Sequence, residues 1–216
     1  MPSLSEENYL KVLYKHSADD EQMVSTTSIA FELGINAASV TGMLKKLTAK
    51  GWVAYMKSYG ARLTPAGRKV AVKVIRRHRL WELFLVRVLD FSWNEVHDLA
   101  EQLEHIQSEE LIDRIDLCLG HPAFDPHGDP IPDASGHMAT PKLKSLSSFA
   151  VGRKGRLARV LLQTREFIDF CSAHGLAPGT EIEVLDREEF DGSMRVFIGG
   201  REQLISEKAG RFLMIE

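Results

Sequence analysis

Apolar residues in the first 50 positions of the chain recur at the three- and four-residue spacing of amphipathic helices. Leu10 and Leu13 carry this spacing in a segment that we expect to be helical from residue 5 to about residue 16. Two shorter helices should follow, one through the sequence IAFEL and one through AASVTGMLKKLTAK, with Gly34 ending the first. Two short helices joined by a tight turn that contains glycine are typical of a helix-turn-helix.

The pattern changes at residue 52, where apolar and polar residues begin to alternate. The sequence WVAYMKSYGARLT contains two alternating segments around Tyr59 and Gly60, which predicts a β-hairpin. Thr64 followed by Pro65 then signals a helix start, because proline lacks only an N–H that would have no helical partner there. A helix-turn-helix followed by a hairpin is a winged helix, which we assign to residues 1–74.

Helical spacing returns after the hairpin. A long helix is expected first, and Ser92 and Glu95 form a capping box for a second helix that should reach Ile106. A third helix precedes a stretch rich in Pro, Gly, Asp and Ser, which is typical of a loop and linker. We therefore predict a helical domain over residues 75–140 and a linker over residues 141–149.

From residue 150 onward, short alternating segments are separated by glycine and proline at turn positions. EIEVLD and RVFIGG are typical of strands, and REFIDF is typical of a helix. This pattern predicts a small β-barrel over residues 150–216. The fold class is therefore mainly α with small β modules, in the order winged helix-turn-helix, helical domain and β-barrel.

The composition, with 44% hydrophobic residues and a net charge of −3, excludes fibrous and wholly disordered classes of protein. No apolar run approaches the roughly 20 residues of a membrane-spanning helix, and the first residues lack the pattern of a secretory signal. We therefore expect a cytoplasmic protein with no membrane partner. Cys118 and Cys171 are the two cysteines, and no CxxC pair occurs, so neither a thiolate zinc site nor a disulfide framework is expected.

The small net charge conceals a strong segregation of charge along the chain. Residues 1–79 contain 13 Lys and Arg against 6 Asp and Glu, whereas residues 80–133 contain 2 against 13. A basic head favours double-stranded DNA as its partner over the alternative, a winged helix used for protein contacts. Short polar side chains near the start of a recognition helix reach base edges, and lysines contact phosphates. The candidate DNA-binding residues are Asn36, Ser39, Thr41, Lys45 and Lys46 in the helix and Lys57 and Arg62 in the wing.

The acidic middle of the chain carries histidines and carboxylates that share helix faces, and the sequence DPHGD adds two more in a constrained turn. Carboxylates gathered in this way repel one another, and a divalent cation relieves the repulsion. The alternative is a solvated helix face with ordinary carboxylate–histidine pairs. The candidate metal ligands are His78, Glu82, His97, Glu101, Glu104, His105, Asp125 and His127.

Oxygen and imidazole ligands without thiolates suit Mn(II) or Fe(II) better than a closed structural zinc site. The Irving–Williams order nevertheless favours Zn(II), so zinc binding in vitro is expected as well and the residues alone leave the metal open.

Five stretches of the sequence together resemble the diphtheria toxin repressor family of metal-dependent transcriptional regulators. They are SEENYLKVLY, the helix-turn-helix, RRHRLWELFLV, EVHDLAEQLEHIQS and FDPHGDPIP, and they span essentially the whole chain. The resemblance implies a homodimer in which the helical domain serves dimerisation and metal binding and the C-terminal domain is SH3-like. It also implies a repressor that binds a pseudo-palindromic operator when loaded with Mn(II) or Fe(II) and controls genes for metal-ion uptake.

The resemblance carries the metal positions onto the same eight candidate ligands. Glu101 stands where the iron-responsive branch of the family has cysteine, which favours Mn(II). Where manganese regulators have an aspartate ligand and then a glutamate, this chain has Asn8 and Lys11, and a charged lysine cannot be a ligand. Asn8 and Glu7 are substitute candidates, and Gln163 lies near the point where related regulators supply a ligand from the barrel.

Two other functions are alternatives to this interpretation. A metal-independent winged-helix regulator would bind an organic ligand and use the acidic middle as surface. A metal-dependent hydrolase would use the same His and Glu cluster, but the sequence contains no HExxH motif and no evident nucleophile with its base. We therefore expect a regulator rather than an enzyme, with no organic substrate.

Overall fold

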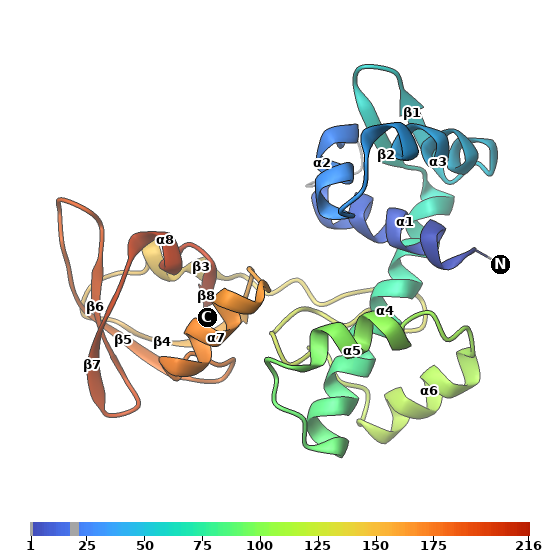
Figure 1. Ribbon diagram of the computed structural model, residues 1–216. Helices are drawn as coiled ribbons and strands as arrows, with labels where there is room; N and C mark the ends of the chain where they lie inside the picture. The colour runs from blue at the N-terminus through green and yellow to red at the C-terminus, as the bar shows by residue number, and fades with distance from the viewer. Residues whose placement is uncertain (1, 18–21) are drawn as a thin grey trace. The chain divides into compact units, whose positions relative to one another are not determined.

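The computed structural model describes residues 2–17 and 22–216 and is shown in Figure 1. The chain forms two compact units. The first unit comprises Met1–His78, Glu101–Asp113 and Pro132–His137, and the second comprises Arg79–Ala100, Arg114–Ile131 and Met138–Glu216. No helix among the described residues has both the length and the apolar character needed to cross a membrane.

The N-terminal part of the first unit is a winged helix, as predicted. Ser3, Ser25 and Asn36 each accept a backbone N–H at the start of a helix, which fixes where the three helices begin. Leu10 and Leu44 are fully buried between these helices, and the two strands pair antiparallel. The elements are α1 (Leu4–His16), α2 (Thr26–Glu32), α3 (Ala37–Ala49), β1 (Val53–Met56) and β2 (Gly60–Leu63).

Three helices follow, and one of them is shorter than predicted. They are α4 (Pro65–Leu89), α5 (Val96–Leu103) and α6 (Glu109–Cys118). The prediction that the second would reach Ile106 is wrong, because the chain leaves the helix after Leu103 in a tight turn closed by the Ile106 N–H and the Leu103 carbonyl. The carbonyl of Glu104 instead accepts a hydrogen bond from the buried Arg77 side chain.

The C-terminal part of the chain is rich in β-structure. Its core is built from alternating strand positions such as Val184, Val196 and Leu213, all fully buried. Six strands pair antiparallel in the order β3-β8-β4-β5-β6-β7. Among the described residues no ladder joins β3 to β7, so the six strands form a sheet whose closure into the predicted barrel is not observed. The elements are β3 (Lys144–Ser145), the 3-10 turn η1 (Leu146–Ser148), β4 (Lys154–Val160), α7 (Arg165–Ala173), β5 (Glu181–Arg187), β6 (Met194–Ile198), β7 (Arg201–Ile205), α8 (Glu207–Gly210) and β8 (Leu213–Ile215).

Candidate metal centre and DNA-binding surface

Three buried side chains of the second unit converge in what we call the loop cluster. Glu82 comes from α4, and Asp125 and His127 come from the loop that follows α6. One ligand atom from each lies within 4.8 Å of the other two, and no more than 6% of any of these residues is exposed. His97 borders the cluster, since its Nδ1 lies 3.1 Å from Oε1 of Glu82. Four of the eight predicted ligands therefore meet here.

In the loop that follows α6, one side-chain atom of Asp125 and one of His127 make no hydrogen bond with any described residue. Oδ1 of Asp125 accepts the backbone N–H groups of His127 and Asp129 at 2.8 and 2.9 Å, which fixes the carboxylate in place. Oδ2 of Asp125 and Nδ1 of His127 are buried, and within the described part of the chain neither makes a hydrogen bond. Buried polar atoms in this condition are costly unless a ligand satisfies them. A divalent cation fits this donor set of carboxylate oxygens and imidazole nitrogen.

The electrostatics of the loop cluster also favour a cation. Burial, the nearby Glu82 carboxylate and Asp129 raise the pKa of Asp125 from 3.8 to about 7. Burial alone would lower the pKa of His127, but the Glu82 carboxylate, 3.6 Å from its Nδ1, outweighs this effect and raises it. The guanidinium of Arg79 lies 3.6 Å from Oδ2 of Asp125, beyond hydrogen-bond distance. The raised pKa of Asp125 shows that the carboxylates packed around it repel one another, and a bound cation would relieve this repulsion.

Asp129 ties the loop to the β-rich region of the same unit. It forms an ion pair with Arg159 of β4 and accepts a hydrogen bond from the Gln163 amide nitrogen. The Val160 N–H donates to the His127 carbonyl at 2.9 Å. Gln163, a candidate ligand in the sequence, is thus a partner of Asp129 and is not one of the three clustered residues. A cavity of about 290 Å³ in the same unit is lined in part by His97, His127 and Gln163.

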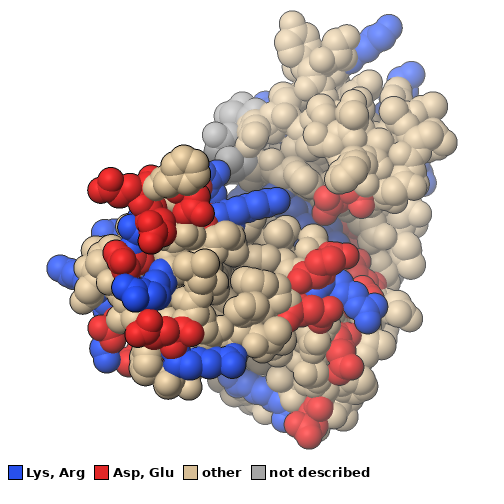
Figure 2. All heavy atoms as spheres, turned by 60° about the vertical axis from the view of Figure 1, so that its left-hand side comes forward, with Lys and Arg blue, Asp and Glu red and all other residues tan. Residues whose placement is uncertain are grey.

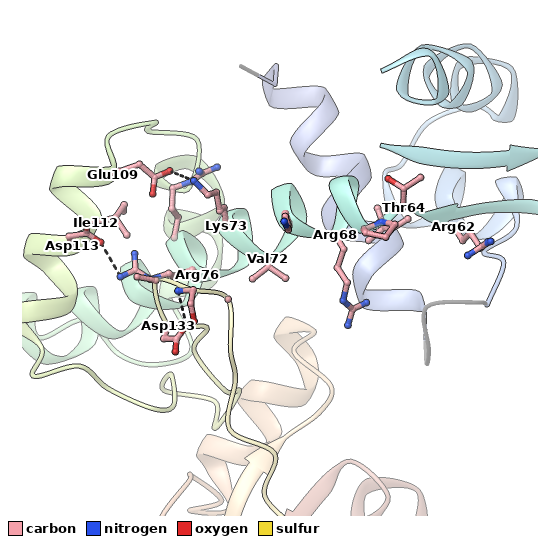
Figure 3. Close-up of a pocket in the computed structure, with 17 residues that line it drawn as sticks. Arg62, Thr64, Arg68, Val72, Lys73, Arg76, Glu109, Ile112, Asp113 and Asp133 are labelled. Carbon is pink, nitrogen blue, oxygen red and sulfur yellow. Dashed lines mark hydrogen bonds and ion pairs between the residues drawn. The ribbon is translucent and has the colours of Figure 1, made fainter. Parts of the chain in front are cut away.

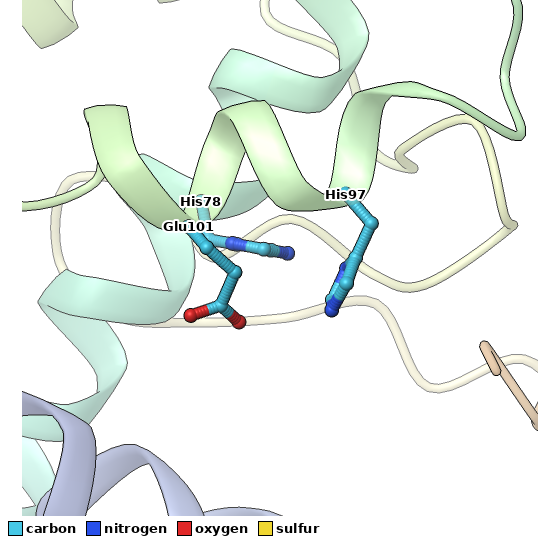
Figure 4. Close-up of side chains that lie close together, drawn as sticks. All are labelled: His78, His97 and Glu101. Atoms are coloured by element: carbon cyan, nitrogen blue, oxygen red, sulfur yellow. The ribbon is translucent and has the colours of Figure 1, made fainter. Parts of the chain in front are cut away.

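Carboxylates and histidines of the first unit form a second group, which we call the α5 cluster. Oε2 of the fully buried Glu104 lies 2.6 Å from Nδ1 of His78, and Oε1 of Glu104 and of Glu101 each accept a hydrogen bond from Lys11. The ligand atoms of His78 and Glu101 lie within 4.8 Å of each other, and Figure 4 shows these two side chains on the same side of α5. Glu104 reaches the cluster from beyond the end of α5, so the prediction that it shares a helix face with Glu101 is wrong.

Glu7 and Asn8 extend the α5 cluster from α1. The Glu7 carboxylate, 1% exposed, accepts a hydrogen bond from Arg77 and lies 2.6 Å from Nδ1 of His105. Oδ1 of Asn8 is buried and accepts no hydrogen bond from any described residue. Most carboxylate oxygens here are therefore engaged by Lys11, Arg77 or histidine, whereas Asn8 offers an unused acceptor.

The sequence did not predict that Lys11, Arg77 and Asp129 bind the side chains of the two clusters or their neighbours. Asp129 belongs to the DPHGD motif, and Arg77 precedes His78, so proximity along the chain was the available signal. No sequence signal pairs Lys11 with Glu101, 90 residues away.

The predicted DNA-binding residues differ in how exposed they are. Ser39, Lys45 and Lys57 are exposed, Thr41 and Arg62 are half-buried, and Asn36 uses its side-chain oxygen to cap α3. At the top of Figure 2, where the β1–β2 hairpin lies, the charged side chains in view are blue. Lys46 lies 2.9 Å from the buried carboxylate of Glu6, so its ammonium is directed toward α1.

The first unit also contains an open cavity of about 820 Å³ beside the N-terminal half of α4 (Figure 3). Lys73 and Glu109, and likewise Arg76 and Asp113, form ion pairs at 3.2 Å across this groove. Two of its cationic side chains, Lys73 and Arg76, therefore have carboxylate partners from α6.

A winged helix joined in one chain to buried carboxylate–histidine clusters defines a metal-responsive DNA-binding protein. Three family descriptions match: "Iron dependent repressor, N-terminal DNA binding domain" over residues 2–61, "Iron dependent repressor, metal binding and dimerisation domain" over residues 64–133 and "FeoA domain" over residues 144–216. The chain belongs to this iron-dependent repressor family, so it is a metal-dependent transcriptional repressor that binds operator DNA as a homodimer.

Individual relatives agree with this assignment. The diphtheria toxin repressor of Corynebacterium diphtheriae is 26% identical over 222 residues, which cover 97% of this chain and 96% of that protein. The transcriptional regulator MntR of Geobacillus kaustophilus is 35% identical over 115 residues, 53% of this chain and 80% of that protein. A solved manganese-dependent transcriptional repressor in complex with manganese is 35% identical with a TM-score of 0.86, covering 97% of this chain and 98% of that one. The structure of ScaR with bound Zn²⁺ is 30% identical with a TM-score of 0.79, covering 100% and 99%.

The ion pairs of Glu6 predict a pH-dependent contribution to stability. Burial alone would raise the pKa of this carboxyl, but hydrogen bonds from Lys50, the Ser3 N–H and Lys46 lower it from 4.5 to about 2. A carboxyl with a lowered pKa in the folded state stabilises the protein above its unfolded pKa, and this stabilisation is lost as the pH falls from 4.5 toward 2.

Glu6→Gln should therefore lower the free energy of unfolding by about 1–2 kcal/mol at pH 7, a figure reduced because the lysines are partly exposed. The difference from wild type should shrink as the pH falls below 4.5, as measured by urea unfolding between pH 7 and pH 3. Glu32→Gln, which removes an exposed carboxylate paired with His16, is the matched control and should have little effect. A deficit of Glu6→Gln that stays constant down to pH 3 would show that the ion pairs are not its cause.

Proposed function

We propose that this repressor responds to Mn(II) and that the loop cluster is its sensing site. The observation that carries the proposal is the convergence of Glu82, Asp125 and His127, all buried, with Asp125 Oδ2 and His127 Nδ1 lacking hydrogen bonds within the described residues. Bound metal would supply positive charge that neutralises these carboxylates. His97, at hydrogen-bond distance from Glu82, is the fourth candidate of this site.

The choice of Mn(II) rests on the donor atoms. Two carboxylates and imidazole without thiolate are the ligands that suit Mn(II) and Fe(II). In the separate α5 cluster, Glu101 stands where a cysteine would favour a softer ion. Relatives solved with manganese and with zinc show that related folds accept both ions. Fe(II) is the alternative physiological metal, and Zn(II) should bind in vitro because of its place in the Irving–Williams order.

The α5 cluster supplies the remaining candidates, namely His78, Glu101, Glu104 and His105, with Glu7 and Asn8 beside them from α1. Because α1 packs in the core of the winged helix, contacts between α1 and Glu101 or Glu104 join the acidic region to the DNA-binding head. Any change in the charge of the α5 cluster therefore acts on α1.

We assign DNA contacts to the exposed face of α3 and to the wing. Ser39 and Thr41 lie near the start of α3, where side chains reach base edges, and Lys45 and Lys57 are placed for phosphates. In a homodimer the two recognition helices would read the halves of a pseudo-palindromic operator, and the controlled genes would be those for metal-ion uptake. A repressor of this kind acts in the cytoplasm, where the chromosome lies.

The end of α4 offers an apolar surface for the dimer contact. Val88 is 47% exposed and Leu89 is 52% exposed, and Phe91 follows them with 39% of its surface exposed. Adjacent apolar side chains left in water mark interaction surfaces. We therefore place part of the subunit interface there.

DNA binding measured against metal concentration tests the proposed function. Operator DNA is first selected from a random-sequence library by the Mn(II)-loaded protein, and its affinity is then measured by fluorescence anisotropy after chelation and with controlled free Mn(II), Fe(II) or Zn(II). We expect Mn(II) to raise the affinity by roughly 5- to 150-fold, the usual range of coupling between two sites. His127→Gln should abolish most of this gain.

His121→Gln provides the matched control, because His121 is an exposed histidine of the same unit that pairs with Asp116 outside the cluster. It should respond to Mn(II) as the wild type does. Operator affinity that is unchanged by chelation and by all three metals would refute the proposal. A full response in His127→Gln would remove this residue from the sensing site.

A further inference from the structure

Lys11 carries a positive charge into the α5 cluster. Its ammonium nitrogen lies 2.6 Å from Oε1 of Glu101 and 2.6 Å from Oε1 of Glu104, and its side chain is 5% exposed. Burial alone would raise the pKa of the Glu101 carboxyl, but the charge and the hydrogen bond of Lys11 lower it below its usual value. The Glu101 carboxylate is thus held ionised beside a cation that belongs to the chain itself.

The position of this ammonium is that of a cation that bridges two carboxylates. An ammonium has three donors and no lone pair, so Lys11 satisfies the carboxylates without being able to ligate a metal. A divalent ion placed between the same two oxygens would meet the ammonium at contact distance, where the repulsion between like charges is strong in a buried site. The ammonium and a bridging ion therefore exclude each other.

The loop cluster differs from the α5 cluster in this respect. Nε of Arg79 lies 3.6 Å from Oδ2 of Asp125, and this oxygen makes no hydrogen bond with any described residue. In the α5 cluster the corresponding oxygens of Glu101 and Glu104 are already bonded at 2.6 Å. The two clusters of this chain thus differ in how much of their negative charge a metal is needed to neutralise.

We propose that Lys11 is a built-in cation that takes the place of one divalent ion between Glu101 and Glu104. It joins α1 to the end of α5 without metal, and it lowers the metal capacity of the subunit by one ion. The inference rests on the proposed function, because it leaves the loop cluster as the site that makes the repressor depend on metal.

Metal counting in a charge-deleted variant tests the inference. Lys11→Met removes the ammonium and keeps a side chain of similar length, and Lys15→Met removes an exposed charge from the same helix as the matched control. After equilibrium dialysis against Mn(II), elemental analysis should give one more ion per subunit in Lys11→Met than in the wild type, and no change in Lys15→Met. Equal counts in Lys11→Met and wild type would overturn the inference.

A measurement on the wild-type protein covers the case in which Lys11→Met does not fold. The buried ammonium should give a slowly exchanging signal in ¹⁵N-detected NMR, identified by its loss in Lys11→Arg, which keeps the positive charge. This signal should persist at saturating Zn(II), a diamagnetic ion. Its disappearance on Zn(II) binding would show that metal displaces Lys11 and would overturn the inference.

Failure of this inference can be told apart from failure of the proposed function. If Lys11 is displaced by metal, or if its removal adds no ion, while operator binding still depends on Mn(II), only the role of Lys11 is wrong. If the wild type binds no Mn(II), or if its affinity for the operator is the same with and without metal, the proposed function itself fails.

Discussion

Gly128→Ala should destabilise the second unit by roughly 2–5 kcal/mol and abolish the metal binding that we propose for the loop cluster. Gly128 has φ of +83°, which L side chains rarely adopt, and it lies between His127 and Asp129. A Cβ at this position would lie 1.9 Å from the Ala158 carbonyl oxygen and 2.8 Å from Cα of Arg159. Since both neighbours are backbone atoms, the loop has to move away from β4, and the contacts of Asp129 with Arg159 and Gln163 are then lost.

Gly152→Ala separates the steric effect from the effect of backbone conformation. Gly152 has φ of +76° in the same unit, and a Cβ there would meet no atom within 4 Å. Its substitution should cost only about 1–2 kcal/mol, the price of a left-handed conformation. Urea unfolding and Mn(II) titration of both variants check the prediction. Equal destabilisation by the two substitutions would show that the approach of the loop to Ala158 contributes nothing.

Leu44→Ala should lower the free energy of unfolding of the winged helix by about 2–5 kcal/mol. Leu44 is fully buried and belongs to the same cluster as Leu10, Leu13 and Leu47, so its removal leaves a cavity in the core of the winged helix. Because α3 carries the candidate base contacts, operator affinity should fall even at saturating Mn(II), while the number of bound ions stays the same.

Met43→Ala is the control for Leu44→Ala. Met43 is the preceding residue of α3 and is only partly buried, so the loss of stability should be smaller. Urea unfolding, operator anisotropy and metal counting are measured on both variants. The prediction is wrong if Leu44→Ala keeps wild-type stability, or if its DNA binding is lost only together with bound metal.

Local signals in the sequence were sufficient for most of the fold. The helix stop at Gly34, the Thr64-Pro65 start and the alternation around Gly60 each act within a few residues, and the structure confirms a winged helix built on them. The end of α5 could not be predicted in this way. The side chain of Arg77, 27 residues earlier in the chain, donates a hydrogen bond to the Glu104 carbonyl, just beyond the point where the helix ends.

The sequence by itself determined the order of the modules, the basic head and the acidic middle, and the residue types that could hold a divalent ion. Only the tertiary structure decided which of those ligand atoms are already engaged by a charged side chain of the protein. Asp125 and His127 retain buried atoms that make no hydrogen bond with any described residue, whereas Glu101 and Glu104 are already bound by Lys11. The physical reason is that a ligand's capacity depends on every charge packed against it, and the charge that matters most here comes from a helix about 90 residues away in the chain.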